Sequence, residues 1–356
     1  MSDSRASADG MTSMQRVLTT LGHQEPDRVP LLLLPVMQGA RELGLSIQDY
    51  FARPEQVAEG QLRLRARYRH DCLYSFYYAA IETEAWGGTA IYREDGPPNA
   101  GAPVIRRPED IDHLRTPVVE DSPSLLKVLE TTRLLAEEAG GEVPIIGVVM
   151  SPFSLPVIQM GFEAYLVLMH EQPERFEQLM RLNEEFCVAW GNAQVAAGAN
   201  AICYFDPVSS ATIIPRERFL KTGFEIARRT LGRLQAPSTM HFASGRALPI
   251  VDLLPATGAA AIGVSHHEDL GALKQACRGR LSLLGNLNGI AMRRWTPEQA
   301  EAEVKAAIAA AGPGGGFLLG DNHGEIPWQV PDRVLLAITA AVERWGRYPL
   351  HWCRRD

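Results

Sequence analysis

Several protein classes are excluded by what the sequence lacks. Cysteine is scarce, with five residues in a chain of 356 and no Cys-x-x-Cys pair, which argues against a disulfide framework or a zinc ribbon. No apolar run approaches the ~18 residues of a membrane-spanning helix. The first ten residues carry no apolar core of the kind found in signal peptides. We therefore expect a cytoplasmic protein.

The chain also has fewer basic than acidic residues, and it lacks the common nucleotide-binding motifs. Lys and Arg number 35 against 42 Asp and Glu, giving a net charge of −7, which disfavours nucleic acid and anionic membranes as partners. No Gly-x-Gly-x-x-Gly sequence follows a predicted strand, and no Walker sequence is present. The glycine-rich run at 312–316 precedes a strand, which is the wrong order for a phosphate cradle. A nicotinamide- or ATP-dependent enzyme is therefore disfavoured.

The chain does contain a repeated rhythm of short apolar runs that end in polar residues, with helical sequence between them. Runs of this length, apolar on both faces, are typical of parallel strands buried on both sides. They lie at Val29–Val36, Cys72–Tyr77, Ile145–Met150, Ala201–Asp206, Thr239–Ala243, Ala261–Ser265, Leu281–Asn286 and Phe317–Asp321. The pattern predicts an α/β protein with a (β/α)8 TIM barrel.

The barrel is expected to form one domain over residues 11–352, after a disordered tail at 1–10. A helical extension at 11–22 should precede the first strand. The segment 86–107 is rich in Gly, Pro, Asn and Asp, which break helices, so it should form an insertion after the second strand, near the barrel mouth.

Polar residues at the strand ends are candidates for chemistry, because the active site of such a barrel lies there. Glu82 and Glu84 lie two apart, so an extended backbone would place both on one face; one of them could instead form a salt bridge at the rim. Asp206 could act in the site or cap its loop, and His266 and His267 could contact substrate or simply precede the next helix. The candidates are Gln38, Glu82, Glu84, Asp206, His241, His266, His267, Asn286, Asp321 and His323.

Ordered motifs along nearly the whole chain resemble the uroporphyrinogen decarboxylase superfamily, and within it the corrinoid-dependent methyltransferases more than the true decarboxylases. The motifs are Asp27-Arg28-Val29-Pro30, Ile81-Glu82-Thr83-Glu84-Ala85-Trp86-Gly87, Pro152-Phe153-Ser154-Leu155, Gly198-Ala199-Asn200-Ala201-Ile202, Phe205-Asp206-Pro207 and Leu284-Gly285-Asn286-Leu287-Asn288. True decarboxylases carry an arginine-containing stretch after the first strand that grips the substrate carboxylates. Here Leu34-Pro35-Val36-Met37-Gln38-Gly39-Ala40 contains none before Arg41, and a substrate with many carboxylates needs several cations.

The resemblance also implies where a metal would bind. The methyltransferase branch commonly holds zinc through His-x-Cys after the fifth strand and a second Cys after the eighth. This chain keeps His241 but has Ala243 and Ser244 near the first cysteine position, and His323 lies near the second. Two interpretations remain open. Either zinc is held by His241, His323 and a carboxylate from Glu82, Glu84 or Asp321, an ordinary ligand set for catalytic zinc, or the metal is lost and the polar cluster binds substrate and transfers protons.

We therefore expect a methyltransferase that moves a methyl group between a small methylated substrate and a corrinoid carried by a separate protein. The chain has no Asp-x-His-x-x-Gly cobalamin motif of its own, so the corrinoid protein would be its partner, and a homodimer stays open. The alternatives are a decarboxylase or lyase on a non-tetrapyrrole acid and a non-catalytic ligand-binding barrel. The predicted roles are catalytic for His241, His323, Asp206 and Glu84, metal-binding for His241, His323, Glu84 and Asp321, and substrate-binding for Gln38, Glu82, Met150, His266, His267, Asn286 and Asn322.

Overall fold

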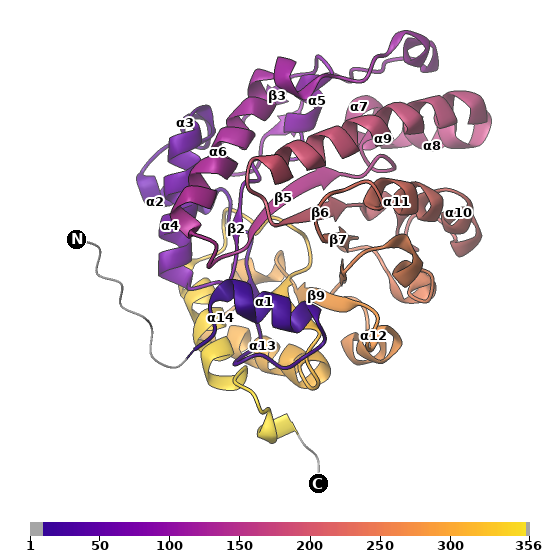
Figure 1. Cartoon of the computed structure of the whole chain (residues 1–356). Coiled ribbons are helices and arrows are strands. Elements are labelled where there is room, and N and C mark those ends of the chain that lie inside the picture. Colours follow the sequence, from indigo (N-terminus) through magenta and orange to yellow (C-terminus); the bar gives the residue numbers. More distant parts are fainter. Residues whose placement is uncertain (1–9, 354–356) are drawn as a thin grey trace.

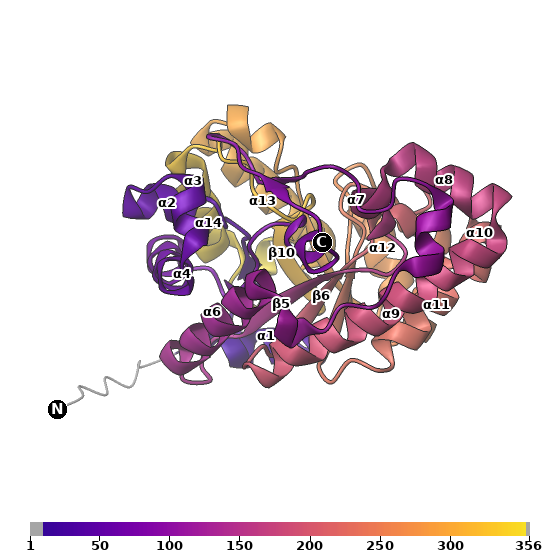
Figure 2. The same ribbon diagram turned by 90° about the horizontal axis from the view of Figure 1, so that it is seen from above.

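The computed structural model describes residues 10–353, and its centre is a curled, eight-stranded parallel sheet (Figures 1 and 2). Each of the eight predicted runs overlaps one strand, and β7 and β9 each extend one residue beyond their predicted run. In spatial order the strands are β1 (Leu31–Leu32), β10 (Phe317–Asp321), β9 (Ser282–Leu287), β8 (Ala261–Gly263), β7 (Ser238–His241), β6 (Ala201–Phe205), β5 (Ile145–Met150) and β2 (Leu73–Tyr74).

The two edge strands of this sheet, β1 and β2, lie next to each other. The Asp71 N–H, just before β2, donates to the Leu31 carbonyl oxygen of β1 at 2.7 Å. No ladder of strand pairing joins β1 to β2 within the described residues. The α/β class and the curled parallel sheet are as predicted, and the arrangement is consistent with a (β/α)8 barrel.

Helices cover the outside of the curled sheet, as the alternation of apolar runs and helical sequence predicts (Figure 2). Thr12 and Thr296 begin their helices with complete capping boxes, and proline occupies the first turn of several others. The helices are α1 (Ser13–Leu21), α2 (Gln38–Leu43), α3 (Ile47–Ala52), α4 (Pro54–Tyr68), α5 (Ile81–Ala85), α6 (Pro123–Ala139), α7 (Pro156–Met160), α8 (Phe162–Glu171), α9 (Pro173–Ala196), α10 (Arg216–Lys221), α11 (Gly223–Leu231), α12 (Leu270–Cys277), α13 (Pro297–Ala311) and α14 (Asp332–Trp345).

The insertion after β2 lies outside the main sheet, as predicted. It contains a small antiparallel pair, β3 (Ala90–Ile91) and β4 (Asn99–Ala100). Its tip is tied to the loop after β10, because the Gln329 side-chain amide donates to the Asp95 carbonyl oxygen at 2.8 Å. Pro97, Pro98 and Asn99 of this insertion reach the cavity described below.

The structure contradicts one local prediction and does not describe the region of another. Glu82 and Glu84 do not lie on an extended backbone, because the chain turns into the short helix α5 there, so the prediction that both side chains share one face is wrong. The predicted tail at 1–10 lies outside the described residues, apart from Gly10.

The base of the sheet carries a buried ionic cluster. Asp71, whose side chain is 1% exposed, accepts hydrogen bonds from Arg16 at 2.6 Å, from Arg28 at 2.6 Å and from the Leu31 N–H at 2.9 Å. Arg16 also forms a two-pronged pair with Asp27. This cluster joins α1 to β1 and to the segment that enters β2, which fixes the lower end of the sheet.

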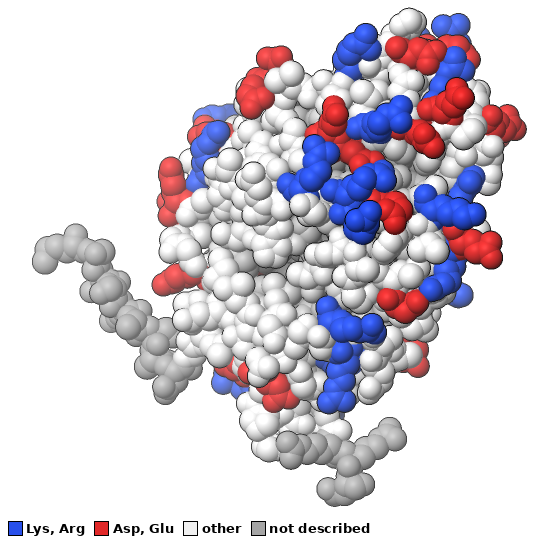
Figure 3. All heavy atoms as spheres, turned by 45° about the vertical axis from the view of Figure 1, so that its right-hand side comes forward, with Lys and Arg blue, Asp and Glu red and all other residues white. Residues whose placement is uncertain are grey.

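The face in Figure 3 shows positive and negative side chains interspersed. Exposed pairs such as Arg216 with Asp252, and Arg228 with Glu225, keep opposite charges adjacent. The described residues visible there form no continuous basic surface of the kind that nucleic-acid binding favours. Between residues 10 and 353, every helix is too short or too polar to cross a lipid bilayer.

Candidate active site

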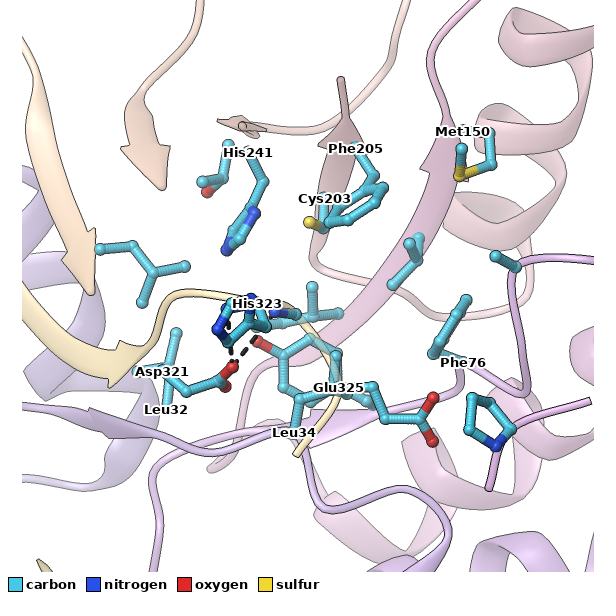
Figure 4. Close-up of a pocket in the computed structure, with 18 of the residues that line it drawn as sticks. Leu32, Leu34, Phe76, Met150, Cys203, Phe205, His241, Asp321, His323 and Glu325 are labelled. Carbon is cyan, nitrogen blue, oxygen red and sulfur yellow. Dashed lines mark hydrogen bonds between the residues drawn. The ribbon is translucent and has the colours of Figure 1, made fainter. Parts of the chain in front are cut away.

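A cavity of about 210 Å³ lies inside the curled sheet and opens at the ends of the strands (Figure 4). Alternate residues of β5 and β6 line it, as the two-residue period of a strand requires. Its inner part is lined by the small side chains Ala201, Cys203 and Thr239. A barrel interior is normally filled by bulky branched side chains, so these small residues leave the space open.

The wall of the cavity is mostly apolar, and its polar groups lie towards the mouth. Among the described residues that line it there is no Lys or Arg. The imidazole and carboxyl side chains in the lining are those of Asp321 and His323 from the end of β10 and the loop beyond, Glu325 from the same loop, and His241 from the end of β7. The apolar lining includes Leu32, Leu34, Tyr74, Phe76, Ile146, Val148, Met150, Phe205 and Leu284.

His241 is a neutral side chain with a fixed proton position. Its Nδ1 accepts a hydrogen bond from the Ala243 N–H at 3.0 Å, and burial lowers the pKa of His241 to about 4. A neutral imidazole whose Nδ1 accepts must carry its proton on Nε2. Nε2 is therefore a donor, and the ring points into the cavity (Figure 4).

The local sequence makes room for this ring. Ala243 adopts a φ of 51°, which is uncommon for a residue other than glycine, in the turn that brings its N–H to the imidazole. On the neighbouring strand β8, a Cβ atom at Gly263 would lie 2.2 Å from Cδ2 of His241. Phe205 stacks on the imidazole, with ring centroids 5.5 Å apart.

His323 lines the same cavity as His241 (Figure 4). Its Nδ1 is 2.6 Å from the Ser244 hydroxyl, and its Nε2 is buried without a hydrogen-bond partner within the described residues. Burial lowers the pKa of His323, so this imidazole is also neutral near pH 7. The two histidines predicted from different strand ends are thus brought to the same cavity.

Two carboxyl groups complete the polar part of the cavity. Oδ2 of Asp321 accepts the N–H groups of His323 at 2.9 Å and Gly324 at 3.1 Å, yet burial raises the pKa of Asp321 to about 7. Burial, with a contribution from Asp321, raises the pKa of Glu325 to about 8, and Oε1 of Glu325 is buried without a partner. Near pH 7 this pair can therefore hold a proton.

The predicted zinc site does not assemble in the part of the chain that the structure describes. No group of three His, Cys, Asp or Glu side chains between residues 10 and 353 is placed to hold a metal ion. Nδ1 of His241 is occupied by a backbone N–H, and its Nε2 carries the proton that a metal would have to replace. The carboxylate of Glu84 is turned away towards Tyr78. These residues do not fit zinc.

Two predicted acidic residues lie away from the cavity, because α5 directs them elsewhere. Oε1 of Glu82 accepts the Met150 N–H at 2.8 Å, and burial raises the pKa of Glu82 to about 8. Glu84 accepts the Tyr78 hydroxyl at 2.8 Å and lines a separate surface groove beside Pro117 and Ser122. The structure therefore gives Glu82 a position behind β5 and gives Glu84 no contact with His241.

Asp206 was predicted to be catalytic but does not line the cavity. Its buried carboxylate accepts three serine hydroxyls, from Ser151 at 2.6 Å, Ser154 at 2.7 Å and Ser209 at 2.5 Å. This places Asp206 as a tie between the loops after β5 and β6. These contacts are the ones expected from the alternative prediction, in which Asp206 caps its loop.

Of the predicted substrate-binding residues, Met150 lines the cavity and the others do not. Gln38 donates to the carbonyl oxygens of Ile326 and Pro327, and Asn286 donates to that of Ser265. His266, Asn322 and His267 lie behind His323, with the rings of His266 and His267 only 3.7 Å apart. Those three form a layer outside the cavity wall.

Several cavity residues were not predicted as site residues. Glu325 follows β10 by four residues, beyond the strand end at which site residues are expected; the polar stretch Asn322–Glu325 is the signal for it in the sequence. Tyr74, Phe76, Cys203 and Phe205 belong to apolar runs that the sequence marks only as core. Whether these side chains face the cavity or a filled core depends on how small the side chains on neighbouring strands are.

Comparison with known proteins agrees with this fold. The uroporphyrinogen decarboxylase family model matches residues 12–345. A uroporphyrinogen decarboxylase from Alkalilimnicola ehrlichii is 28% identical, over 94% of this chain and 94% of its own. A methyltransferase from Methanosarcina mazei superposes with a TM-score of 0.84 at 20% identity, covering 94% of this chain and 99% of its own. A B12-independent methionine synthase from a Shewanella species gives a TM-score of 0.56 at 13% identity, covering 83% and 89%.

The family model spans nearly all of the described chain, from the start of α1 to the end of α14. The chain therefore belongs to the uroporphyrinogen decarboxylase family.

Proposed function

We propose that this protein is a methyltransferase that moves a methyl group between a small, largely apolar substrate in the cavity and a corrinoid presented by a separate protein. The observation that carries the proposal is the cavity itself. It is apolar, free of Lys and Arg among its described lining residues, and ends in a neutral histidine donor and two carboxyls of raised pKa.

The volume and the charge of the same cavity disfavour uroporphyrinogen as the substrate. About 210 Å³ falls below the ~300–1,000 Å³ of ordinary small-molecule pockets, and a tetrapyrrole with many carboxylates would meet two carboxyls and no cation. Arg41 does not compensate, because its guanidinium stacks on Trp328 and donates to the Trp328 carbonyl oxygen. A lyase that uses Asp206 for proton transfer loses support as well, since three serines surround that carboxylate.

A corrin ring is also too large for this cavity, which fits a corrinoid held by a partner at the mouth. The corrinoid would supply a nucleophilic acceptor for the methyl group. The chain's own residues do the rest. The apolar wall holds the substrate and excludes water, and His241 Nε2–H donates to the heteroatom that carries the methyl group. As the carbon–heteroatom bond breaks, the heteroatom keeps the electron pair and takes a proton held by Asp321 or Glu325.

The test is an assay with free cob(I)alamin under anaerobic conditions and a panel of O-methyl, N-methyl and S-methyl compounds of about ten heavy atoms. We expect at least one compound to give the absorbance change of cobalamin methylation, dependent on the protein. Glu84→Gln, which alters a carboxylate outside the cavity, is the matched control and should keep the wild-type rate. Tight binding of a panel compound without turnover would instead identify a ligand-binding barrel. Conversion of uroporphyrinogen would contradict the proposal.

A further inference from the structure

A chain of polar side chains runs from the cavity outward behind His323. Nδ1 of His323 lies 2.6 Å from the Ser244 hydroxyl, which lies 3.4 Å from the Asn322 side-chain amide. That amide lies 3.0 Å from Nδ1 of His266, and Nε2 of His266 lies 2.9 Å from the side-chain nitrogen of Asn288. The chain links a cavity histidine to groups that no substrate in the cavity touches.

The outer end of this chain has a fixed direction. Oδ1 of Asn288 accepts the Ala291 N–H at 3.0 Å, so the Asn288 side-chain nitrogen must face His266 and donate to its Nε2. Burial lowers the pKa of His266, which keeps its imidazole neutral. A neutral imidazole that accepts at Nε2 carries its proton on Nδ1. His266 therefore donates towards Asn322.

This direction sets the orientation of the Asn322 amide. A donor at Nδ1 of His266 requires an acceptor opposite, so the Asn322 oxygen rather than its nitrogen must face His266; the two orientations of an asparagine amide occupy the same space. The oxygen then lies 3.4 Å from the Ser244 hydroxyl and accepts from it.

We propose that Ser244 and Asn322 are positioning residues that hold His323 with its proton on Nδ1. Since the Ser244 hydroxyl hydrogen points to Asn322, its oxygen accepts from His323 Nδ1–H at 2.6 Å. Nε2 of His323, which is buried and has no partner among the described residues, is then a bare acceptor on a ring that lines the cavity. Opposite it, His241 offers a donor at Nε2.

The cavity thus presents one donor and one acceptor, which narrows the substrate class, on the assumption that the proposed methyl transfer is correct. The matching group both accepts and donates a hydrogen bond: a hydroxyl, thiol, or primary or secondary amine. A methyl ether or thioether has no such donor, whereas its demethylated form does. With an ether or thioether substrate, His323 therefore receives a hydrogen bond from the heteroatom only after demethylation.

The direct test is the tautomer of His323, measured by ¹⁵N NMR on the full-length protein labelled at histidine, without substrate or corrinoid. The His323 signal is assigned by its loss in His323→Gln. We expect wild-type His323 to be protonated on Nδ1, Ser244→Ala to lose that preference, and Ser244→Thr to keep it. Asn322→Asp should also keep it, because a carboxylate offers only acceptors to His266 and Ser244.

Ser265→Ala is the matched control, since Ser265 is a buried serine at the same mouth whose hydroxyl accepts the His267 backbone N–H and forms no hydrogen bond to a histidine ring within the described residues. It should leave the His323 signal unchanged. A wild-type His323 protonated on Nε2, or a Ser244→Ala protein with an unchanged tautomer, would overturn the proposal. Should Ser244→Ala fail to fold, the wild-type, Ser244→Thr and Asn322→Asp spectra still decide.

The measurement is independent of methyl transfer, so a failed activity assay and a wrong tautomer are separate outcomes. If both proposals hold, Ser244→Ala should lower kcat about tenfold or more with a smaller change in KM, because an imidazole in the wrong tautomer costs rate rather than binding. Ser244→Thr should restore it.

Discussion

The two ends of the sheet differ in whether their buried carboxyl groups are paired with cations. At the base, Asp71 is almost fully buried and meets Arg16, Arg28 and a backbone N–H. At the mouth, Asp321 and Glu325 form no ion pair within residues 10–353, and Glu325 Oε1 has no partner at all. Both ends contain buried acids, but only the base supplies them with cations.

The difference separates holding the fold from binding a ligand. A buried carboxylate with cations and N–H donors stays charged and joins the segments that surround it. A buried carboxyl without a cation is easier to protonate, as the raised pKa values of Asp321 and Glu325 show. The paired charges at the base therefore stabilise the fold, and we expect the unpaired groups at the mouth to be the ones that meet a ligand.

Breaking the base should have the largest effect on stability. Asp71→Asn leaves the buried Arg16 and Arg28 short of a counter-charge, so we expect the free energy of unfolding to fall by about 3–5 kcal/mol. Denaturant unfolding followed by circular dichroism measures this. Asp252→Asn removes an exposed partner of Arg216 and should cost less than about 1 kcal/mol. Equal losses in the two variants would contradict the comparison.

Breaking the mouth should remove activity and leave the fold. His241→Ala deletes the donor at Nε2, so we expect methyl transfer to fall by roughly 10²–10³-fold. The free energy of unfolding should change by only about 1–2 kcal/mol, because one partly packed ring at a cavity is lost. Initial rates and denaturant unfolding are compared in the same preparation. A His241→Ala protein with full activity would remove His241 from the site.

The sequence alone was enough to predict where the strands lie and that His241 and His323 meet at one end of the sheet. β5 and β10 match their predicted runs to the residue, because strands buried on both faces need continuous apolar sequence. His241 and His323 could be placed at one mouth because parallel strands all end at the same edge. These inferences depend on local pattern and on the handedness of the fold, both of which a single sequence carries.

The finer geometry was not available from the sequence, for reasons visible in particular residues. Glu82 and Glu84 were separated by a single turn of helix, which the strand pattern did not predict. Asp206 was given a catalytic role, but serines from two different loops converge on it. The unfilled space depends on Ala201, Cys203 and Thr239 lying together across neighbouring strands, a tertiary coincidence that no local pattern encodes.

Replacing Glu82, a buried carboxyl that forms no ion pair within the described residues, should change how the free energy of unfolding depends on pH. Burial raises the pKa of Glu82 to about 8, so the folded state binds its proton more tightly than the unfolded state does. The stability that the neutral form provides is full below about pH 4.5 and is lost as pH rises towards about 8. Glu82→Gln keeps the acceptor for Met150 and cannot ionise. The free energy of unfolding of Glu82→Gln should match that of wild type near pH 4.5 and exceed it by roughly 4 kcal/mol near pH 8, because each unit of pKa shift corresponds to about 1.4 kcal/mol; parallel pH curves for the two proteins would refute this.

The smallest expected effect comes from moving His241 rather than removing it. In Gly263→Ala the new Cβ would lie 2.2 Å from Cδ2 of the His241 ring, so the ring must shift while its hydrogen bond from Ala243 limits where it can go. We expect methyl transfer to fall by about tenfold, because displacement of a hydrogen-bond donor weakens it without deleting it. Overpacking should cost about 1–3 kcal/mol of stability. Gly96→Ala, at the tip of the insertion with open space around its Cβ, should leave both quantities near wild type. Unchanged activity in Gly263→Ala would mean that the mouth tolerates movement of His241, and that its donor is not held in place for catalysis.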